Sequence, residues 1–255
     1  MNVSAQLISH TYKLPDKSRL AALQSVDLNL TSGDFIALVG PSGCGKSTLL
    51  RILAGLLKPN QGEVLLDTAP PAEIVSKKKI GWLAQSPALL PWKTVRDNIA
   101  LAQQINPQNG REVLAVEEYL ELVGLAEFGE AYPFNLSGGM QHRAALARTL
   151  ALGAELWLMD EPFAALDELT REALAGEVLA LWQRFRPSVV WVTHHLYEAA
   201  HLADRTLVMS ARPGRITADI EIKLSRPRQE ADPEFQAVIA RLRAALRQPR
   251  EQVAV

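Results

Sequence analysis

The alternation of apolar and polar residues along the chain predicts an α/β protein built on buried strands. Over residues 23–30, Val26, Leu28 and Leu30 occupy alternate positions, which is the period of a half-buried strand. The apolar run 35–39 is continuous and is closed by Gly40, as in a strand that is buried on both faces of a sheet. Similar short runs predict further strands at 64–66, 80–83, 156–159, 189–192 and 207–209.

Helical spacing of apolar residues occurs in three parts of the chain. Leucines over 47–57 predict a helix that stops at Lys58-Pro59-Asn60. From about 87 to 152 there is no strand-like run, and the pattern predicts helices at 95–103, 111–123 and 137–152. The segment 233–246 has one apolar face, with Asp232 placed as N-cap, and predicts a packed terminal helix. We therefore expect an α/β domain over 1–225 with a helical subdomain inserted at about 87–152, and a helical tail over 226–255.

The composition is that of an ordinary globular protein, and it narrows the class of function. The chain has 255 residues, of which 48% are hydrophobic and 22% charged, and its formal net charge is −1. A nearly neutral chain has no global field that would draw it to nucleic acid or to an anionic membrane. Neither a secretory signal nor a run of roughly 18 apolar residues is visible. Cys44 is the single cysteine, so no intrachain disulfide can form, and we expect a cytoplasmic protein.

A glycine-rich segment between the predicted strand 35–39 and the predicted helix 47–57 matches the phosphate-loop pattern G-x-x-x-x-G-K-[ST] in full. Its glycines allow consecutive N–H groups to point at phosphate oxygens, and the following helix adds its positive N-terminal end. We expect Lys46 to reach the β- and γ-phosphates and the Ser47 hydroxyl to ligate Mg²⁺. The pattern predicts that a nucleoside triphosphate is bound by Gly40, Pro41, Ser42, Gly43, Cys44, Gly45, Lys46, Ser47 and the adjacent Thr48.

Two further segments can complete a triphosphate site. The predicted strand 156–159 runs into two carboxylates, of which Asp160 is placed to contact Mg²⁺ and Glu161 to orient or deprotonate an attacking water. The segment 136–140, here called the signature loop, has Ser137 as an N-cap before Gly138, Gly139 and a helical run, which makes a second anion-binding helix start. One chain has no evident need for two such devices, whereas two facing chains can close them on one triphosphate.

The order of these elements resembles the ABC ATPase family over residues 1 to about 225. The letters L-S-G-G in the signature loop are diagnostic of that family. The resemblance implies a P-loop NTPase core with a mostly parallel sheet, an N-terminal antiparallel β part and an inserted helical subdomain. It also implies that two cassettes bind two ATP molecules head to tail, each between the phosphate loop of one subunit and the signature loop of the other.

The resemblance assigns roles to residues that would mean little alone. Gln85 matches the glutamine that contacts Mg²⁺ and the helical subdomain, and His194 matches the switch histidine that hydrogen-bonds the γ-phosphate, so both join Glu161 as catalytic residues. Asp167 matches the loop that crosses the dimer interface, and it can also cap a helix that begins near residue 168. Tyr12 matches the aromatic residue that stacks on adenine, with edge or core packing as the alternative.

Three positions depart from the family pattern, and none of the departures indicates a function. Met140 follows the signature glycines, where glutamine is commoner and relatives tolerate other residues. The family commonly has aspartate after the switch histidine, and this chain has His195. His142 stands on the helix after the signature loop, where many members have glutamine.

The resemblance implies an ATPase that uses ATP and Mg²⁺ to energise solute import, peripherally on the cytoplasmic face of the inner membrane. Its partners would be a second ATPase subunit (the same chain or a close paralogue), integral-membrane permease subunits and, indirectly, a solute-binding protein, but no nucleic acid. The segments 90–99 and 210–216 resemble the importers of nitrate, sulfonates, taurine and pyrimidine precursors. The alternatives are a non-transport ABC ATPase acting on nucleic acid or the ribosome, and a phosphate-loop kinase. A kinase has no use for the signature loop.

The placement of Cys44 predicts a reactive thiol. A thiol beside inward-pointing N–H groups, a helix N-terminus and Lys46 should favour its thiolate form and have a lowered pKa. We therefore expect N-ethylmaleimide to modify Cys44 and Mg-ATP to protect it.

Overall fold

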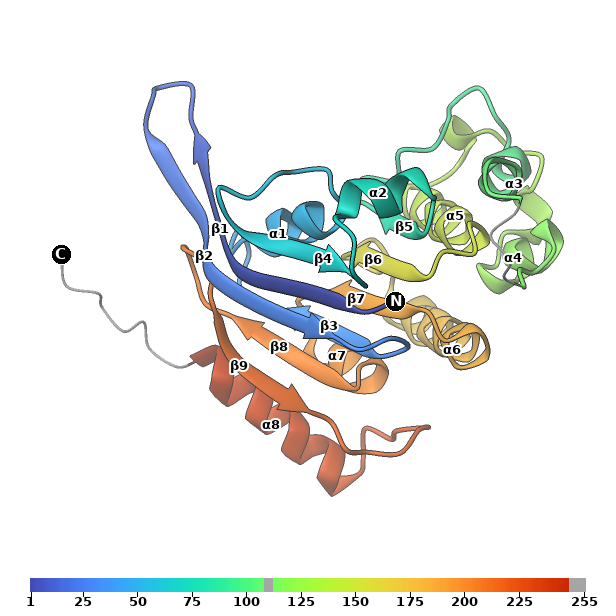
Figure 1. Ribbon diagram of the computed structural model, residues 1–255. Helices are drawn as coiled ribbons and strands as arrows, with labels where there is room; N and C mark the ends of the chain where they lie inside the picture. The colour runs from blue at the N-terminus through green and yellow to red at the C-terminus, as the bar shows by residue number, and fades with distance from the viewer. Residues whose placement is uncertain (108–111, 248–255) are drawn as a thin grey trace, which may run out of the picture.

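The computed structural model describes residues 1–107 and 112–247, and its centre is a six-stranded sheet (Figure 1). Neighbouring strands of this sheet run parallel, except that β9 pairs antiparallel with β8 at one edge. The strand order is β5-β6-β7-β3-β8-β9, and the strands are β3 (Phe35–Val39), β5 (Ile80–Leu83), β6 (Leu156–Asp160), β7 (Ser188–Val192), β8 (Arg205–Met209) and β9 (Ile216–Glu221).

A second, antiparallel sheet of three strands covers one face of the central sheet. Its order is β2-β1-β4, with β1 (Val3–Lys13), β2 (Arg19–Leu30) and β4 (Gln61–Leu66). The continuous apolar run of β3 follows from this layering, because Ile36 and Leu38 join the core cluster toward the antiparallel sheet while Phe35 and Ala37 join the cluster on the other face. The expected α/β fold, with its mostly parallel sheet and its N-terminal antiparallel part, is confirmed.

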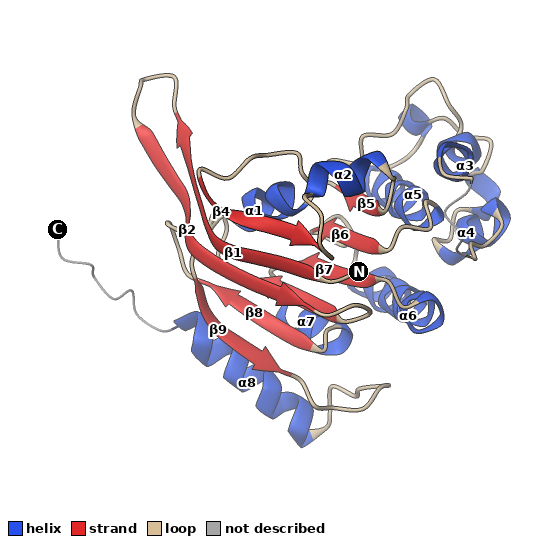
Figure 2. Ribbon diagram, in the orientation of Figure 1, coloured by secondary structure: helices blue, strands red, loops and turns tan. Residues whose placement is uncertain are grey.

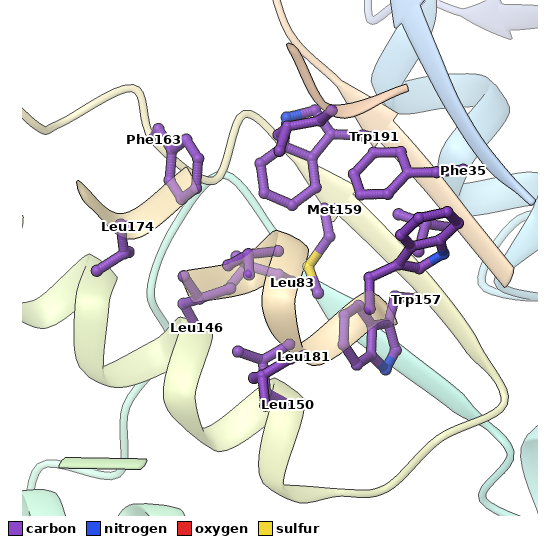
Figure 3. Close-up of a cluster of buried hydrophobic side chains, with 14 of the residues drawn as sticks. Phe35, Leu83, Leu146, Leu150, Trp157, Met159, Phe163, Leu174, Leu181 and Trp191 are labelled. Carbon is purple, nitrogen blue, oxygen red and sulfur yellow. The ribbon is translucent and has the colours of Figure 1, made fainter. Parts of the chain in front are cut away.

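Helices supply the remaining layers, as Figure 2 shows. They are α1 (Lys46–Leu53), α2 (Pro71–Ser76), α3 (Val95–Ile105), α4 (Val116–Leu122), α5 (Gly138–Ala151), α6 (Glu168–Phe185), α7 (Leu196–Leu202) and α8 (Pro233–Arg247), with 3₁₀ turns at Ala126–Phe128 and Pro133–Asn135. Helices α3, α4 and α5 pack on one another beside the β5 edge of the sheet. Figure 3 shows how Leu146 and Leu150 of α5 meet Trp157 and Met159 of β6 in the core. No described helix is both long and apolar enough to cross a membrane.

Three expectations about helices had mixed outcomes. The terminal helix is confirmed, since Phe235 and Leu242 of α8 are buried and α8 packs against α7. The predicted helix 47–57 is wrong beyond Leu53, because Gly55 adopts a left-handed φ of 69° and Leu56 is left 61% exposed. The predicted helix 111–123 starts later, at Val116; its first residue lies outside the described part of the chain.

Candidate active site

The topology of the central sheet brings the sequence-predicted residues to one edge. Strands β3, β5, β6 and β7 are parallel neighbours in the order β5-β6-β7-β3, so their carboxyl ends lie side by side. The segments that follow them carry the phosphate loop after β3, Gln85 after β5, Glu161 after β6 and His194 after β7. Ligands of open α/β sheets bind at this edge, where the connections diverge to either side of the sheet.

A cavity of about 730 Å³ opens at this edge, a size that accommodates a small-molecule ligand. The residues that line it come from segments far apart in the sequence. Its walls are formed by Tyr12, Leu20, Ala22, Gly40, Pro41, Ser42, Gly43, Gly45, Lys46, Ser47, Thr48, Gln85, Glu161, His194, Arg212 and Leu246.

The phosphate loop holds its lysine in a closed arrangement. Lys46 is 6% exposed, and its Nζ donates to Gly40 O at 2.8 Å and to Pro41 O at 3.1 Å. The loop ends at Gly45, whose φ of 104° leads into the first turn of α1. The cation and the free N–H groups at the start of α1 therefore lie in one small volume, which is suited to a polyphosphate.

Ser47 and Asp160 bring two side-chain oxygen atoms together beside the phosphate loop. The Ser47 hydroxyl donates to Asp160 Oδ1 at 3.1 Å, and Asp160 is only 3% exposed. Burial raises the pKa of Asp160, while the hydrogen bond from Ser47 and the nearby Arg51 and Lys46 act in the opposite direction. A hydroxyl and a carboxylate at this spacing suit Mg²⁺, which prefers oxygen ligands and takes its remaining positions from water and phosphate.

Glu161 and His194 face each other across the mouth of the site. His194 Nδ1 lies 3.5 Å from Glu161 Oε2, and the two side chains are 50% and 21% exposed. Glu161 has a φ of 51°, in the left-handed region that non-glycine residues rarely adopt, and its N–H donates to Val192 O at 3.0 Å. Strained backbone of this kind is typical of functional positions. The geometry places a carboxylate and an imidazole together at the cavity, an arrangement that can serve acid–base chemistry.

Tyr12 projects from β1 over the start of α1. Its hydroxyl lies 3.2 Å from Thr48 Oγ1, and His10 packs edge-on against its ring with the centroids 4.7 Å apart. Both Tyr12 and Thr48 line the cavity. The ring thus lies at the wall of the cavity, and its base-stacking role stays a prediction.

The signature loop lies outside this cavity. Ser137 is the N-cap of α5, accepting a hydrogen bond from Met140 N at 3.3 Å, and nothing lies within 4 Å of a Cβ built on Gly138. A Cβ on Gly139 would lie 3.0 Å from Ala165 O, so the signature loop adjoins the segment that ends in Asp167. The structure therefore does not bring Ser137, Gly138 or Gly139 to the phosphate loop of the same chain.

Asp167 is the N-cap of α6, as the sequence predicts. It accepts hydrogen bonds from Thr170 N at 2.9 Å and from Thr170 Oγ1 at 2.7 Å, and these bonds lower the pKa of the exposed carboxyl. Like the signature loop, Asp167 does not line the cavity. Its carboxylate is thus engaged within its own chain.

The expectation of a reactive Cys44 is wrong. The side chain is 1% exposed and packs into the core cluster beneath the antiparallel sheet, while the loop around it faces the cavity. Burial raises the pKa of the thiol, although the nearby Lys46 acts in the opposite direction. Its thiol does not line the cavity and accepts a hydrogen bond from Lys46 Nζ at 3.8 Å, so we expect only the backbone of Cys44 to contribute to phosphate binding.

Four residues of the cavity were not predicted as site residues. Leu20 and Ala22 come from β2, Arg212 from the loop after β8, and Leu246 from the last turn of α8. Arg212 lay in a segment that the sequence marked only by its resemblance to a group of importers. Leu246 lay on the apolar face of the terminal helix, and periodicity alone does not show that such a face ends at a ligand cavity.

Known proteins share both the sequence and the fold. The family profile described as ABC transporter matches residues 23–164. An uncharacterized ABC transporter ATP-binding protein of Methanocaldococcus jannaschii is 45% identical over 224 residues, 86% of this chain and 81% of that protein. The aliphatic sulfonates import ATP-binding protein SsuB of Bacillus cereus is 39% identical over 240 residues, 93% of each chain. A solved dimeric ATP-binding cassette, in a post-hydrolysis state bound to ADP and Pi, has a TM-score of 0.77 at 29% identity and covers 88% of this chain and 100% of its own.

Proposed function

The chain belongs to the ABC transporter family, and from that premise we propose that it is the ATP-hydrolysing subunit of a solute importer. It is an ATPase of the transport class. The observation that carries the proposal is the convergence of the phosphate loop, Gln85, Glu161 and His194 on one cavity. These groups come from segments after four different strands, and in-line attack of water on a γ-phosphate requires all of their chemistries together.

Each residue of the site has a distinct task in this proposal. Lys46 leaves its carbonyl partners to neutralise phosphate charge, as the backbone N–H groups of the phosphate loop bind the same oxygens. Tyr12 stacks on the adenine. Glu161 accepts a proton from the attacking water. His194, whose Nδ1 lies 3.5 Å from Glu161 Oε2, donates a hydrogen bond to the γ-phosphate next to that water.

The Ser47–Asp160 pair would hold Mg²⁺, together with Gln85, which lines the same cavity as Ser47. Bound there, the metal supplies positive charge for the phosphate oxygens. The present hydrogen bond between Ser47 and Asp160 keeps both oxygens close together at 3.1 Å, so little rearrangement is required of the protein.

We place the signature loop on the ATP of a second cassette. In support, Ser137 and Gly139 do not reach the cavity of their own chain, while the start of α5 is open at Gly138. The related cassette bound to ADP and Pi is dimeric. The second subunit would be a copy of this chain or a close paralogue.

A permease would dock on the loop after Gln85. Residues 86–94 have no regular secondary structure, and Trp92 is 71% exposed. Buried Asn98 holds this loop in shape: its Oδ1 accepts from Leu90 N at 2.8 Å, and its Nδ2 donates to Lys93 O at 3.1 Å. A fixed loop with an exposed indole, joined directly to the catalytic Gln85, is suited to transmit movement between the site and a membrane partner.

Sulfonate-like compounds are the first candidates for the solute, because the SsuB relatives that import aliphatic sulfonates match the chain over 93% of its length. Nitrate, taurine and pyrimidine precursors remain in the same proposal. The chain itself would work at the cytoplasmic face of the membrane. A non-transport ABC ATPase that acts on nucleic acid is disfavoured by the net charge of −1.

Replacement of Glu161 tests the proposal. Glu161→Gln should keep ATP binding but lower phosphate release at least about 100-fold, because the amide cannot accept the proton from water. With hydrolysis blocked, Mg-ATP should convert the chain into a dimer on size-exclusion chromatography. Glu172→Gln, an exposed change on α6, is the matched control and should behave as wild type. Turnover by Glu161→Gln within a few-fold of wild type would mean that this carboxylate is not the base.

A further inference from the structure

The loop 210–215 after β8 is fixed against the back of the phosphate loop. Gly214 N donates to Ala22 O at 2.9 Å, and Gln24 N donates to Gly214 O at 3.0 Å, so the loop is tied to β2 by backbone bonds on both sides. A Cβ on Gly214 would lie only 2.0 Å from the Cys44 carbonyl oxygen, which means that only glycine permits this approach. The two loops therefore form one unit, although they are far apart in the sequence.

Arg212 extends from this unit along the phosphate loop. Its Nε donates to Gly43 O at 2.8 Å, and a Cβ built on Gly43, whose φ is 72°, would lie 2.6 Å from the Arg212 Nη2 atom. Gly43 is thus the residue that leaves room for the guanidinium. Arg212 is exposed and lines the same cavity as Lys46 and Ser47.

The guanidinium of Arg212 has donors to spare. An arginine carries five N–H donors. Over residues 1–107 and 112–247, the bond from Nε to Gly43 O is the only side-chain hydrogen bond that Arg212 makes. Over the same residues no carboxylate lies within ion-pair distance of Arg212. The carboxylate of Asp219 on the neighbouring strand β9 is paired with Arg205 of β8. Guanidinium groups bind phosphate oxygens through paired N–H donors. A nucleotide in this cavity would bring such negatively charged phosphate oxygens to Arg212.

We propose that Arg212 is a nucleotide-binding residue, whose Nε holds the Gly43 carbonyl while its terminal N–H groups bind the phosphate chain of ATP. The inference rests on the proposed function, because it takes the cavity to be an ATP site. It adds to that function a second cation, delivered by a loop that the phosphate-loop sequence does not contain. The competing interpretation is that Arg212 only braces the phosphate loop through Gly43.

Glutamine separates the two interpretations. The Nε2 atom of glutamine stands at the same number of bonds from the backbone as the Nε of arginine, so Arg212→Gln can still donate to Gly43 O. It lacks the charge and the terminal N–H groups. Arg212→Lys keeps the charge but not the brace. Arg215→Gln is the matched control, because Arg215 lies in the same loop and its guanidinium donates to Gln24 Oε1 at 2.6 Å.

The experiment is calorimetric titration of each full-length variant with Mg-ATP at 50 and 500 mM salt. We expect Arg212→Gln to weaken ATP binding about tenfold at low salt and less at high salt, as for the loss of a charge-assisted phosphate contact. Arg212→Lys should stay within about threefold of wild type. Arg215→Gln should stay within about twofold, because Arg215 does not line the cavity and its guanidinium is bonded to Gln24.

Three results would overturn the inference: an Arg212→Gln affinity within twofold of wild type at low salt, a loss of equal size at both salt concentrations, or the same loss in Arg212→Lys. A thermal melt confirms that each variant is folded before titration. Failure of the proposed function itself would look different. In that case wild type would not bind Mg-ATP, or Lys46→Ala would bind it as tightly as wild type does.

Discussion

Glu198 offers the sharpest quantitative test of the packing beneath the proposed catalytic residues. It lies on α7, is 7% exposed, and accepts a hydrogen bond from the indole N–H of Trp191. The charged groups that face it are Arg171 on α6 and Glu161 after β6. Burial raises the pKa of Glu198 to about 7, while the hydrogen bonds from Trp191 and Thr193 and the charge of Arg171 act in the opposite direction.

The change in stability with pH follows from the pKa of Glu198 in the unfolded and in the folded chain. The unfolded chain has a pKa near 4.5 at this residue, so the native state holds the proton over a pH range in which the unfolded state has lost it. The free energy of unfolding therefore falls as pH rises from about 4.5 to about 7 and levels off above that range. Between pH 5 and pH 8 this one group should lower the free energy of unfolding by about 2–3 kcal/mol.

Glu198→Gln isolates this contribution. The amide oxygen still accepts from Trp191, but the side chain does not titrate. We expect the difference in unfolding free energy between variant and wild type to be about 2–3 kcal/mol more favourable to the variant at pH 8 than at pH 5. Any cost of the amide itself cancels, because it is common to both conditions. Urea unfolding followed by tryptophan fluorescence measures all four free energies. Equal differences at the two pH values would refute the reasoning.

Two further predictions concern the loops around the site. Native protein should react with N-ethylmaleimide at Cys44 at least about 100-fold more slowly than urea-unfolded protein, because the buried thiol needs local opening; rapid labelling of the native chain, followed by mass spectrometry, would contradict this. Trp92→Asp should preserve ATP affinity but lower transport in permease-containing vesicles at least about tenfold, with Val75→Asp on α2 as the exposed control; unchanged transport would remove Trp92 from the docking surface.

The parts of the fold that the sequence predicted well are those with a simple hydrophobic period. Strands over 35–39 and 80–83 were predicted with their observed bounds, because each is a short apolar run buried in a parallel sheet. Strand β1 was missed since its pairing is irregular: the register shifts between Ala5 and Ile8, and Leu7 is 61% exposed with a φ of 52°. Strand β9 was missed because it is an edge strand with mixed burial.

The residues of the candidate site also divide into those that the sequence could predict and those that it could not. Lys46 and Ser47 could be predicted because their chemistry is contained in eight consecutive residues. Arg212 could not, since it meets Gly43 across a separation of 169 residues, which the β3–β8 pairing and the backbone bonds between Gly214 and β2 close. For Cys44 the sequence gives the position in the loop but not the direction of the side chain. A loop that turns its N–H groups toward a ligand directs some side chains into the core, where burial outweighs the nearby positive charge.

The contacts of the signature loop within its own chain indicate how a nucleotide bound there could affect the segment that ends in Asp167. The signature loop touches the next segment at Gly139, 3.0 Å from Ala165 O for a built Cβ. That segment is held by Arg171, which donates to Leu166 O at 2.8 Å and whose charge also acts on His195. A partner nucleotide that bound the signature loop would therefore act on a segment that is already hydrogen-bonded to α6 through Arg171. Gly139 is half-buried and the neighbouring Leu166 is buried, so we expect a displacement of the signature loop to move the segment 161–167 as well.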